Sequence, residues 1–329
     1  MILAGDVGGT KTILALFELK QDQLVEIKKQ QFASSQCQHF SEILQAFVAD
    51  AGAVNISAAC IGIAGPIIDG DCSATNLPWQ VKRSEIAAQL DLKLSQVKLL
   101  NDLESTAWGI LNLSAEHFVE LNTEAQLAVG HVAVIAAGTG LGEAIICWNG
   151  EQYTVMPSEG GHVDFAPNNA TEIGLLTYLM QKYSGHVSYE RVVSGMGVVN
   201  IYQYLKDSGF AAEQPEVAEQ MRQNDPGAVI GAFGQDGRDA LCAETLKIFS
   251  RIYGAQAGNL ALTALPLGGV VLAGGIAAKI LAVMTQGHFM QGFLAKGRYF
   301  DALKKFSVRV CLNPEASLLG AAHYARKLL

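Results

Sequence analysis

The sequence predicts an α/β protein with two lobes of unequal size, and three observations support this prediction. The length of 329 residues suits two domains, since a domain usually holds about 100–200 residues. Residues 2–15 and 134–146 share one pattern: a β-branched run, a turn rich in glycine and threonine, then a second run. This pattern is typical of a β-hairpin with a wide turn. Strand-like runs and helical patterns alternate after both hairpins, as they do in α/β domains.

The remaining elements follow in order along the chain. In the first half we expect strands at 24–32, 58–64 and 97–100 and helices at 40–51, 83–90 and 103–111. In the second half we expect strands at 151–156, 270–273 and 308–312 and helices at 172–183, 195–207, 226–234, 240–265 and 314–327. The polar, acidic stretch 211–226 is expected to be a surface excursion. Pattern alone does not assign the final helix to a lobe.

Composition excludes several classes of protein. Hydrophobic residues make up 50% of the chain and charged residues 16%, which excludes a mainly disordered protein. Lys and Arg number 23 against 31 Asp and Glu, a net charge of −8 that argues against a basic nucleic-acid footprint. The N-terminus has no signal-peptide pattern, and the six cysteines form no CxxC pair. We therefore expect a cytoplasmic protein without a disulfide framework or zinc site.

Residues 252–278 carry no charge, so a membrane span has to be considered. Pro266 and the pairs Gly268-Gly269 and Gly274-Gly275 would break a spanning helix. We expect a buried helix, a turn and a short buried strand here, and no contact with a membrane.

Two glycine turns are candidates for binding phosphate. Glycine lets a ligand approach closely, and successive N–H groups in a turn form a concave anion site. The alternative is that the turns need glycine only for a positive φ. Two turns with threonine, the first led by Asp6 and closed by Lys11, favour a phosphate clamp, although neither is a Walker A or G-x-G-x-x-G motif. The glycines are Gly8, Gly9, Gly138, Gly140 and Gly142.

Asn101 and Asp102 end an apolar run just before a helical pattern, and two interpretations stay open. Asn101 with Glu104 has the spacing of a helix capping box. Alternatively, Asp102 lies at the carboxyl end of a buried strand, where open α/β sheets bind ligands. A carboxylate there could accept the proton of an attacking hydroxyl.

Glu159 and His162 flank a Gly-Gly turn that can hold both side chains on one ligand. A metal site with Asp164 is the chemical rival, but no further His or Cys cluster supports it. A turn whose side chains face solvent is the plain structural alternative. Glu190 is a further candidate, and its structural alternative is a surface carboxylate. Residues 76–79 are another, and they could be only a turn with a packing tryptophan, Trp79. At Gly274-Gly275 a flat base could enter, and the alternative there is tight packing.

Together these motifs resemble the sugar-kinase branch of the actin-like ATPase superfamily, and most closely the bacterial glucokinase family of the zinc-free, non-ROK type. The resemblance covers nearly the whole chain in order. The similar segments are 5–10 and 137–142 for the two phosphate motifs, 272–276 for the adenosine motif, 101–102 for the catalytic pair, and 159–167 and 190–195 for the sugar segments. The sugar loop with Asn-Asp upstream is the specific part of this match.

The resemblance implies a two-lobed, ribonuclease H-like fold with the active site in the cleft between a small lobe (1–112 plus 314–329) and a large lobe (113–313). It implies transfer of the ATP γ-phosphate to the 6-hydroxyl of glucose, and a homodimer. The implied glucose ligands are Asn101, Asp102, Glu159, His162 and Glu190, with Asp102 as general base. The implied ATP contacts are Asp6, Gly8, Gly9, Thr10, Lys11, Gly138, Thr139, Gly140, Gly274 and Gly275, and Asp6 would orient Mg²⁺ through water.

One residue departs from the closest pattern, and three other functions are compatible with parts of it. Lys11 stands where similar glucokinases often have Asn, and the ROK cysteine motif is missing after His162. A kinase for another hexose or amino sugar could use the same frame. A sugar-sensing regulator would need room for a DNA-binding segment before residue 2, and an ATPase without a sugar would not need the Glu159–His162 loop.

Overall fold

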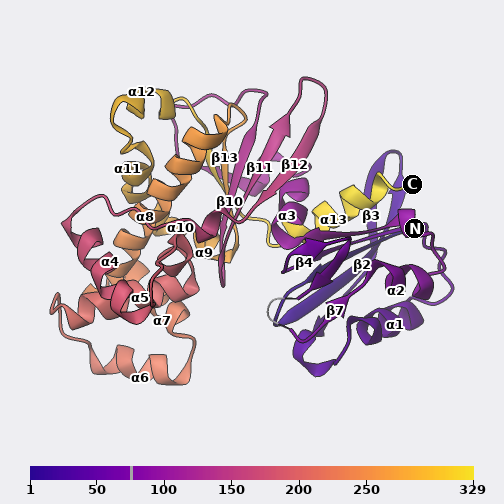
Figure 1. Ribbon diagram of the computed structural model, residues 1–329, viewed down its shortest axis with the longest axis horizontal. Helices are drawn as coiled ribbons and strands as arrows, with labels where there is room; N and C mark the ends of the chain where they lie inside the picture. Colours follow the sequence, from indigo (N-terminus) through magenta and orange to yellow (C-terminus); the bar gives the residue numbers. More distant parts are fainter. Residues whose placement is uncertain (75–76) are drawn as a thin grey trace. The chain divides into compact units, whose positions relative to one another are not determined.

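The computed structural model describes residues 1–74 and 77–329. The chain divides into two compact units, Met1–Ala115 with Asn313–Leu329, and Glu116–Leu312. Each unit has its own main sheet (Figure 1). Each also has its own hydrophobic core. In the described part of the chain, no helix is long and apolar enough to cross a membrane.

The first unit contains a five-stranded sheet in the order β3-β2-β1-β4-β8. Strands β1, β2 and β3 are antiparallel neighbours, whereas β1, β4 and β8 run parallel. The strands of this sheet are β1 (Ile2–Val7), β2 (Lys11–Lys20), β3 (Gln23–Ala33), β4 (Ala58–Ile63) and β8 (Val97–Asn101). A second, small sheet comprises β5 (Ile67–Ile68), β6 (Asp71–Ser73) and β7 (Gln80–Val81). The helices are η1 (Ser34–Gln36), α1 (Phe40–Ala51), α2 (Arg83–Gln89), η2 (Leu94–Gln96), α3 (Asp102–Ile110) and α13 (Ala316–Arg326).

Helices cover both faces of this sheet, with α1 and α2 on one side and α3 and α13 on the other (Figure 1). Apart from Asp6 near its end, strand β1 is apolar on both faces, as expected for a central strand between two helix layers. Helices α3 and α13 approach closely because each has a glycine at the contact. A Cβ at Gly109 would lie 1.9 Å from the Ala316 carbonyl oxygen, and one at Gly320 would lie 1.7 Å from that of Ser105.

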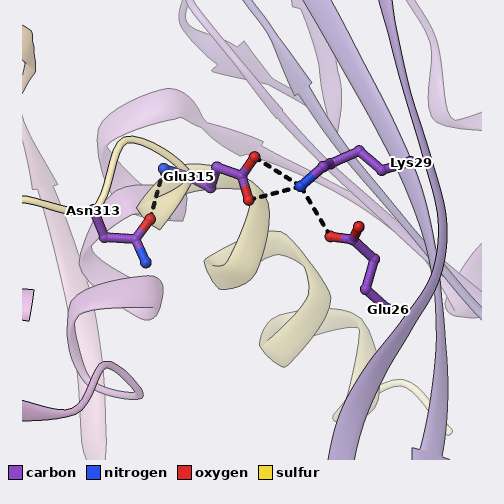
Figure 2. Close-up of polar contacts among 4 residues, drawn as sticks. All are labelled: Glu26, Lys29, Asn313 and Glu315. Atoms are coloured by element: carbon purple, nitrogen blue, oxygen red, sulfur yellow. Dashed lines mark hydrogen bonds and ion pairs between the residues drawn. The ribbon is translucent and has the colours of Figure 1, made fainter.

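The start of α13 is fixed to the sheet by polar contacts, which Figure 2 shows. The Lys29 ammonium on β3 lies 2.8 and 3.0 Å from the two carboxylate oxygens of Glu315. Glu26 lies 3.2 Å from the same ammonium, and Asn313 accepts a hydrogen bond of 2.8 Å from the Glu315 amide. These side chains are partly exposed, so the contacts orient the helix more than they stabilise it.

The second unit repeats this topology on a larger scale, with a six-stranded sheet in the order β12-β11-β10-β13-β14-β9. Its strands are β9 (Phe118–Glu120), β10 (Val132–Ala137), β11 (Leu141–Trp148), β12 (Tyr153–Ser158), β13 (Val270–Ala273) and β14 (Val308–Cys311). Its helices are η3 (Ala115–His117, which begins at the boundary), η4 (Gly160–His162), α4 (Ala170–Lys182), η5 (Tyr189–Arg191), α5 (Gly195–Asp207), α6 (Pro215–Gln223), α7 (Pro226–Gln235), α8 (Ala240–Ala264), α9 (Gly275–Lys279), α10 (Leu281–Met284), α11 (His288–Leu294), η6 (Gly297–Tyr299) and α12 (Phe300–Leu303).

Both predicted hairpins are present, and each continues into a third antiparallel strand. The uncharged stretch 252–278 forms the end of α8, a turn and the buried strand β13, as the sequence predicts. The stretch 211–226 lies largely at the surface, as expected, but it contains helix α6, which the sequence analysis did not predict. That helix buries the single apolar residue Val217, too little to give a helical pattern in the sequence. The sequence also missed the small sheet β5–β7, strand β9 and helices α9 to α12.

Candidate functional site

The first glycine turn joins β1 to β2 and is closed by a hydrogen bond of 2.9 Å from the Gly8 amide to the Lys11 carbonyl. Ser34 supports the turn from behind, because its hydroxyl donates to the Gly8 carbonyl at 2.8 Å. The backbone of Gly8 is outside the left-handed region. A positive φ is therefore not the reason for glycine here, and the interpretation as a ligand-approach turn is favoured.

Asp6 lies near the carboxyl end of β1, beside this turn. Its Oδ1 accepts a hydrogen bond of 2.8 Å from the Ser317 hydroxyl on α13. Burial raises the pKa of Asp6, while the Ser317 hydrogen bond and the Lys11 charge act in the opposite direction. The Ser317 contact uses one carboxylate oxygen. One carboxylate that acts together with substrate phosphates and water is a usual protein contribution to Mg²⁺ binding, so these residues fit that ion.

Asn101 and Asp102 stand where β8 ends and α3 begins. The Asn101 side chain caps the helix by accepting from the Leu103 amide at 2.9 Å, and it donates to the Gly65 carbonyl at 3.2 Å. Asp102 is the first residue of α3 and is half-buried, and its Oδ1 also accepts from the Leu103 amide. The capping interpretation is thus correct for Asn101, and it places Asp102 at the carboxyl edge of the sheet that also carries Asp6.

The second glycine turn joins β10 to β11 in the second unit. A Cβ at Gly138 would meet no atom within 4 Å, and neither Gly138 nor Gly140 has a left-handed backbone. The fold itself does not require glycine at position 138. At Gly140 a Cβ would lie 2.5 Å from Oε2 of Glu190, and the same carboxylate oxygen accepts from the Leu141 amide at 3.1 Å. Glu190 is thereby held against the turn.

The Glu159–His162 loop follows β12 and also packs on the start of β11. A Cβ at Gly161 would lie 1.9 Å from the Leu141 carbonyl oxygen, so only glycine fits there. The side chains of Glu159 and His162 are 77% and 58% exposed, and their nearest polar atoms are 3.9 Å apart. Asp164 instead pairs with His186 at 3.1 Å. Glu159 and His162 therefore share one accessible side of the loop, as binding to a common ligand requires.

Gly274 and Gly275 follow strand β13, which is parallel to β10. Gly274 has a φ of +80°, and a Cβ there would lie 2.4 Å from the Ala137 carbonyl oxygen. This close approach brings the end of β13 beside the second glycine turn. The structural interpretation, tight packing, is correct for Gly274, and Gly275 has open space around its Cα.

Each unit thus gathers the predicted residues that belong to it. In the first unit the sheet edge carries Asp6, the turn of Gly8, Gly9, Thr10 and Lys11, and the Asn101-Asp102 pair. In the second unit the start of β11 joins the turn of Gly138, Thr139 and Gly140 to the segments of Glu159, His162 and Glu190. Trp79 of the predicted turn 76–79 is buried and donates to the Cys37 carbonyl, whereas Asn76 lies outside the described residues.

The sequence analysis did not identify Ser317 as a contact of Asp6. Local sequence patterns carry no signal for a contact between residues 311 positions apart. The sequence analysis also missed a set of buried polar side chains behind segments 159–167 and 190–195, including Tyr189 and Gln256. An available signal was Gln256 and Asn259 in the largely apolar second half of α8.

Comparison with known proteins gives a consistent family. A family model described as Glucokinase matches residues 3–328. A glucokinase of Trichormus variabilis is 41% identical, and the alignment covers 100% of this chain and 99% of that protein. The crystal structure of a glucokinase from an Antarctic psychrotroph has a TM-score of 0.84 and 26% identity over 99% of this chain and 98% of that one. The glucokinase of Balamuthia mandrillaris in complex with glucose has a TM-score of 0.80 at 24% identity and covers 99% of this chain and 93% of that one, which bears on the fold alone. The chain has the actin-like ATPase fold of sugar kinases, as the sequence predicts.

Proposed function

The chain belongs to the glucokinase family, and from this premise we propose how its residues carry out the reaction. It is an enzyme that phosphorylates glucose with ATP. We propose that the γ-phosphoryl group is transferred to the 6-hydroxyl of glucose.

Asp102 is the general base of this proposal. Its carboxylate accepts the proton of the 6-hydroxyl as that oxygen attacks the γ-phosphorus. The bond from the γ-phosphorus to the β,γ-bridging oxygen breaks, and ADP leaves. The supporting observation is the position of Asp102 at the first turn of α3, at the carboxyl edge of the parallel strands, where α/β sheets bind their ligands. Phosphoryl transfer needs positioning and charge stabilisation more than covalent chemistry from the protein.

Glucose is bound in this proposal by Asn101, Asp102, Glu159, His162 and Glu190. Carboxylates suit sugar hydroxyls, because each carboxylate oxygen can accept a hydrogen bond from a hydroxyl. The accessible side of the Glu159–His162 loop supports the assignment. The hydrogen bond that holds Glu190 beside the second glycine turn also supports the assignment. The glucose hydroxyl has to lie next to the γ-phosphate for the transfer, so a glucose ligand beside a phosphate-binding turn is expected.

The two glycine turns hold the phosphates of ATP, and Gly274 and Gly275 border the adenosine. Support comes from Gly8 and Gly138, whose backbones do not need glycine for a left-handed conformation. Lys11 contributes positive charge near the phosphates and near Asp6. Mg²⁺, when bound, neutralises phosphate charge, and Asp6 would hold it through water.

We propose further that the protein works in the cytoplasm as a homodimer. Cys60, Cys72 and Cys242 are buried thiols, which persist in a reducing compartment. The dimer rests on the resemblance to bacterial glucokinases. Sedimentation of the purified protein at several concentrations tests it, since a dimer gives twice the mass of one chain.

The general base is tested by Asp102→Asn. An amide keeps the hydrogen bond to the Leu103 amide and the size of the side chain, but it cannot take the proton. We expect glucose affinity to be retained and kcat to fall at least about 10²-fold, the scale of general-base catalysis. The matched control is Asp225→Asn, which alters another aspartate at a helix start, the N-cap of α7, and is expected to leave kcat unchanged. Near-full turnover by Asp102→Asn would contradict the assignment.

A further inference from the structure

Helix α8 places two amides in the interior of the second unit. Gln256 is only 3% exposed, and Asn259, less than one turn further on, is partly buried. The surrounding residues of this helix are apolar. A buried amide without partners is costly, so the partners of these two side chains indicate why the helix keeps them.

The two amides belong to a chain of hydrogen bonds with one direction. The Lys296 ammonium donates to Oδ1 of Asn259 at 2.6 Å. The Asn259 Nδ2 donates to Oε1 of Gln256 at 3.0 Å, and the Gln256 Nε2 donates to Oε1 of Glu143 at 2.7 Å.

The direction of this chain is fixed at both ends. Lysine can only donate, so Oδ1 of Asn259 must face Lys296 and its amide nitrogen must face Gln256. Gln256 then has its oxygen toward Asn259 and its amide nitrogen toward Glu143, whose carboxylate accepts. Each amide is held in one orientation by its neighbours.

A branch of this chain reaches the segment that carries Glu190. Asn259 uses its second N–H to donate to the Tyr189 hydroxyl at 3.1 Å. Tyr189 is 1% exposed, and it directly precedes Glu190. Its ring packs edge-on against Phe165 at 5.5 Å between centroids, and its backbone amide donates to the Val163 carbonyl at 3.0 Å. Tyr189 thus joins the Glu190 segment to the end of the Glu159–His162 loop.

The other end of the chain lies beneath the start of that loop. Glu143 on β11 is 3% exposed, and its Oε2 would lie 2.2 Å from a Cβ at Gly160. The carboxylate therefore touches the backbone immediately after Glu159. Burial raises the pKa of Glu143, and the hydrogen bond from Gln256 opposes this shift.

We infer that Lys296, Asn259, Gln256, Glu143 and Tyr189 form a positioning network, which sets the two proposed glucose-binding segments at the correct separation. The network contacts Gly160 and Phe165 from behind, and its member Tyr189 is joined directly to Glu190. It acts on glucose only through these segments. The inference rests on the proposed placement of glucose at Glu159 and Glu190.

Two substitutions test the network through the KM for glucose. Tyr189→Phe removes one oxygen and keeps the ring that packs on Phe165. Glu143→Leu removes the acceptor under Gly160, and Glu143→Gln restores an acceptor for Gln256. We expect Tyr189→Phe and Glu143→Leu each to raise the KM for glucose about fivefold or more. The KM for ATP and kcat should stay within about twofold of the original enzyme, and Glu143→Gln should recover most of the glucose KM.

The matched control is Tyr202→Phe. Tyr202 is equally buried in the same unit, and its hydroxyl bonds to Glu213 at 3.2 Å, away from the glucose segments. If Tyr189→Phe lowers the melting temperature as Tyr202→Phe does but leaves the glucose KM unchanged, the role is structural only and the inference is wrong. The same holds if Glu143→Gln is no better than Glu143→Leu.

Glu159→Ala, measured in parallel, separates this inference from the proposed glucose site. If Glu159→Ala leaves the glucose KM unchanged, the placement of glucose itself fails. If it raises that KM while Tyr189→Phe and Glu143→Leu do not, the glucose site stands and the positioning network is refuted.

Discussion

The hydroxyl of Ser317 donates a 2.8 Å hydrogen bond to the carboxylate of Asp6, across 311 residues of sequence. Both residues lie in the first unit, where α13 packs against β1 and β4. The contact joins the last helix of the chain to the residue that precedes the first glycine turn. Asp6 is ionised in the proposed role with Mg²⁺, so any group that favours its charged form supports ATP binding.

Ser317→Ala is expected to move the acidic limb of the pH–activity profile to higher pH. Burial already raises the pKa of Asp6, and the Ser317 hydrogen bond opposes that rise. Without the hydroxyl the pKa rises further, so a smaller fraction of Asp6 is ionised at a given acidic pH. The measurement is kcat/KM for ATP from about pH 5 to pH 8.

The control for this prediction is Ser307→Ala. Ser307 is buried and, like Ser317, donates to a carboxylate, that of Glu120 in the second unit. Its removal should change stability by a similar amount, about 1 kcal/mol, without a change in the pH profile. Identical profiles for Ser317→Ala and the original enzyme would show that Asp6 does not set the acidic limb.

The elements of the fold were largely predictable from sequence because their signals are local. Alternating apolar runs around glycine turns identified both hairpins, and residues 40–51 and 195–207 were predicted with the bounds that α1 and α5 have. The place of α13 was not predictable from its own pattern. Its packing depends on Gly109, which lies against Ala316, and on Gly320, which lies against Ser105. The two residues of each pair are more than half the chain apart in sequence.

Gly138→Ala is expected to weaken ATP binding without unfolding the protein. A Cβ at this position meets no protein atom within 4 Å, so the folded chain tolerates it. In the proposed complex the phosphates approach this turn, and a methyl group would hold them away. We expect the KM for ATP to rise about tenfold, equivalent to about 1.4 kcal/mol, with little change in the KM for glucose.

Gly231→Ala is the matched control for that substitution. Gly231 also has open space for a Cβ and has no left-handed backbone, but it lies within α7. There the same change should stabilise the protein by about 0.5–1 kcal/mol and leave both KM values unchanged. An unchanged KM for ATP in Gly138→Ala would mean that this turn does not contact phosphate.

The site was predictable only where chemistry and turn signals coincide in a short segment. Asp102 follows a buried strand, and Glu159 and His162 flank a glycine pair, so each motif could be read locally. Asn101 illustrates the limit, since its capping role gives the same signal as a ligand role. Ser317 and the amides of α8 act through contacts that only the folded chain creates.

Arg251→Leu is expected to destabilise the second unit strongly. The Glu172 carboxylate is almost fully buried and lies 3.0 Å from the Arg251 guanidinium. Without that partner a charge is left uncompensated in the interior, which costs about 3 kcal/mol. Urea unfolding measures the loss, and adding Glu172→Gln should recover part of it.

Lys29→Met is the comparison, because the partly exposed Lys29–Glu315 pair should contribute at most about 1 kcal/mol. Equal losses for the two pairs would contradict the argument from burial.

The lowered pKa of Lys296 predicts that the stability of the protein depends on pH in the alkaline range. Burial lowers its pKa from 10.5 to about 8, whereas the unfolded chain retains the ordinary value. Between these two values the unfolded protein binds more protons than the folded one, so this lysine makes stability rise as pH rises from about 8 to about 10.5. Lys296→Met removes the ammonium, and the advantage of the original protein over the variant should therefore grow across this window. Melting temperatures at half-unit steps of pH measure this advantage.

The control is Lys247→Met, which removes an exposed lysine paired with Glu244 on α8. Its curve of melting temperature against pH should run parallel to that of the original protein. A parallel curve for Lys296→Met would refute the prediction.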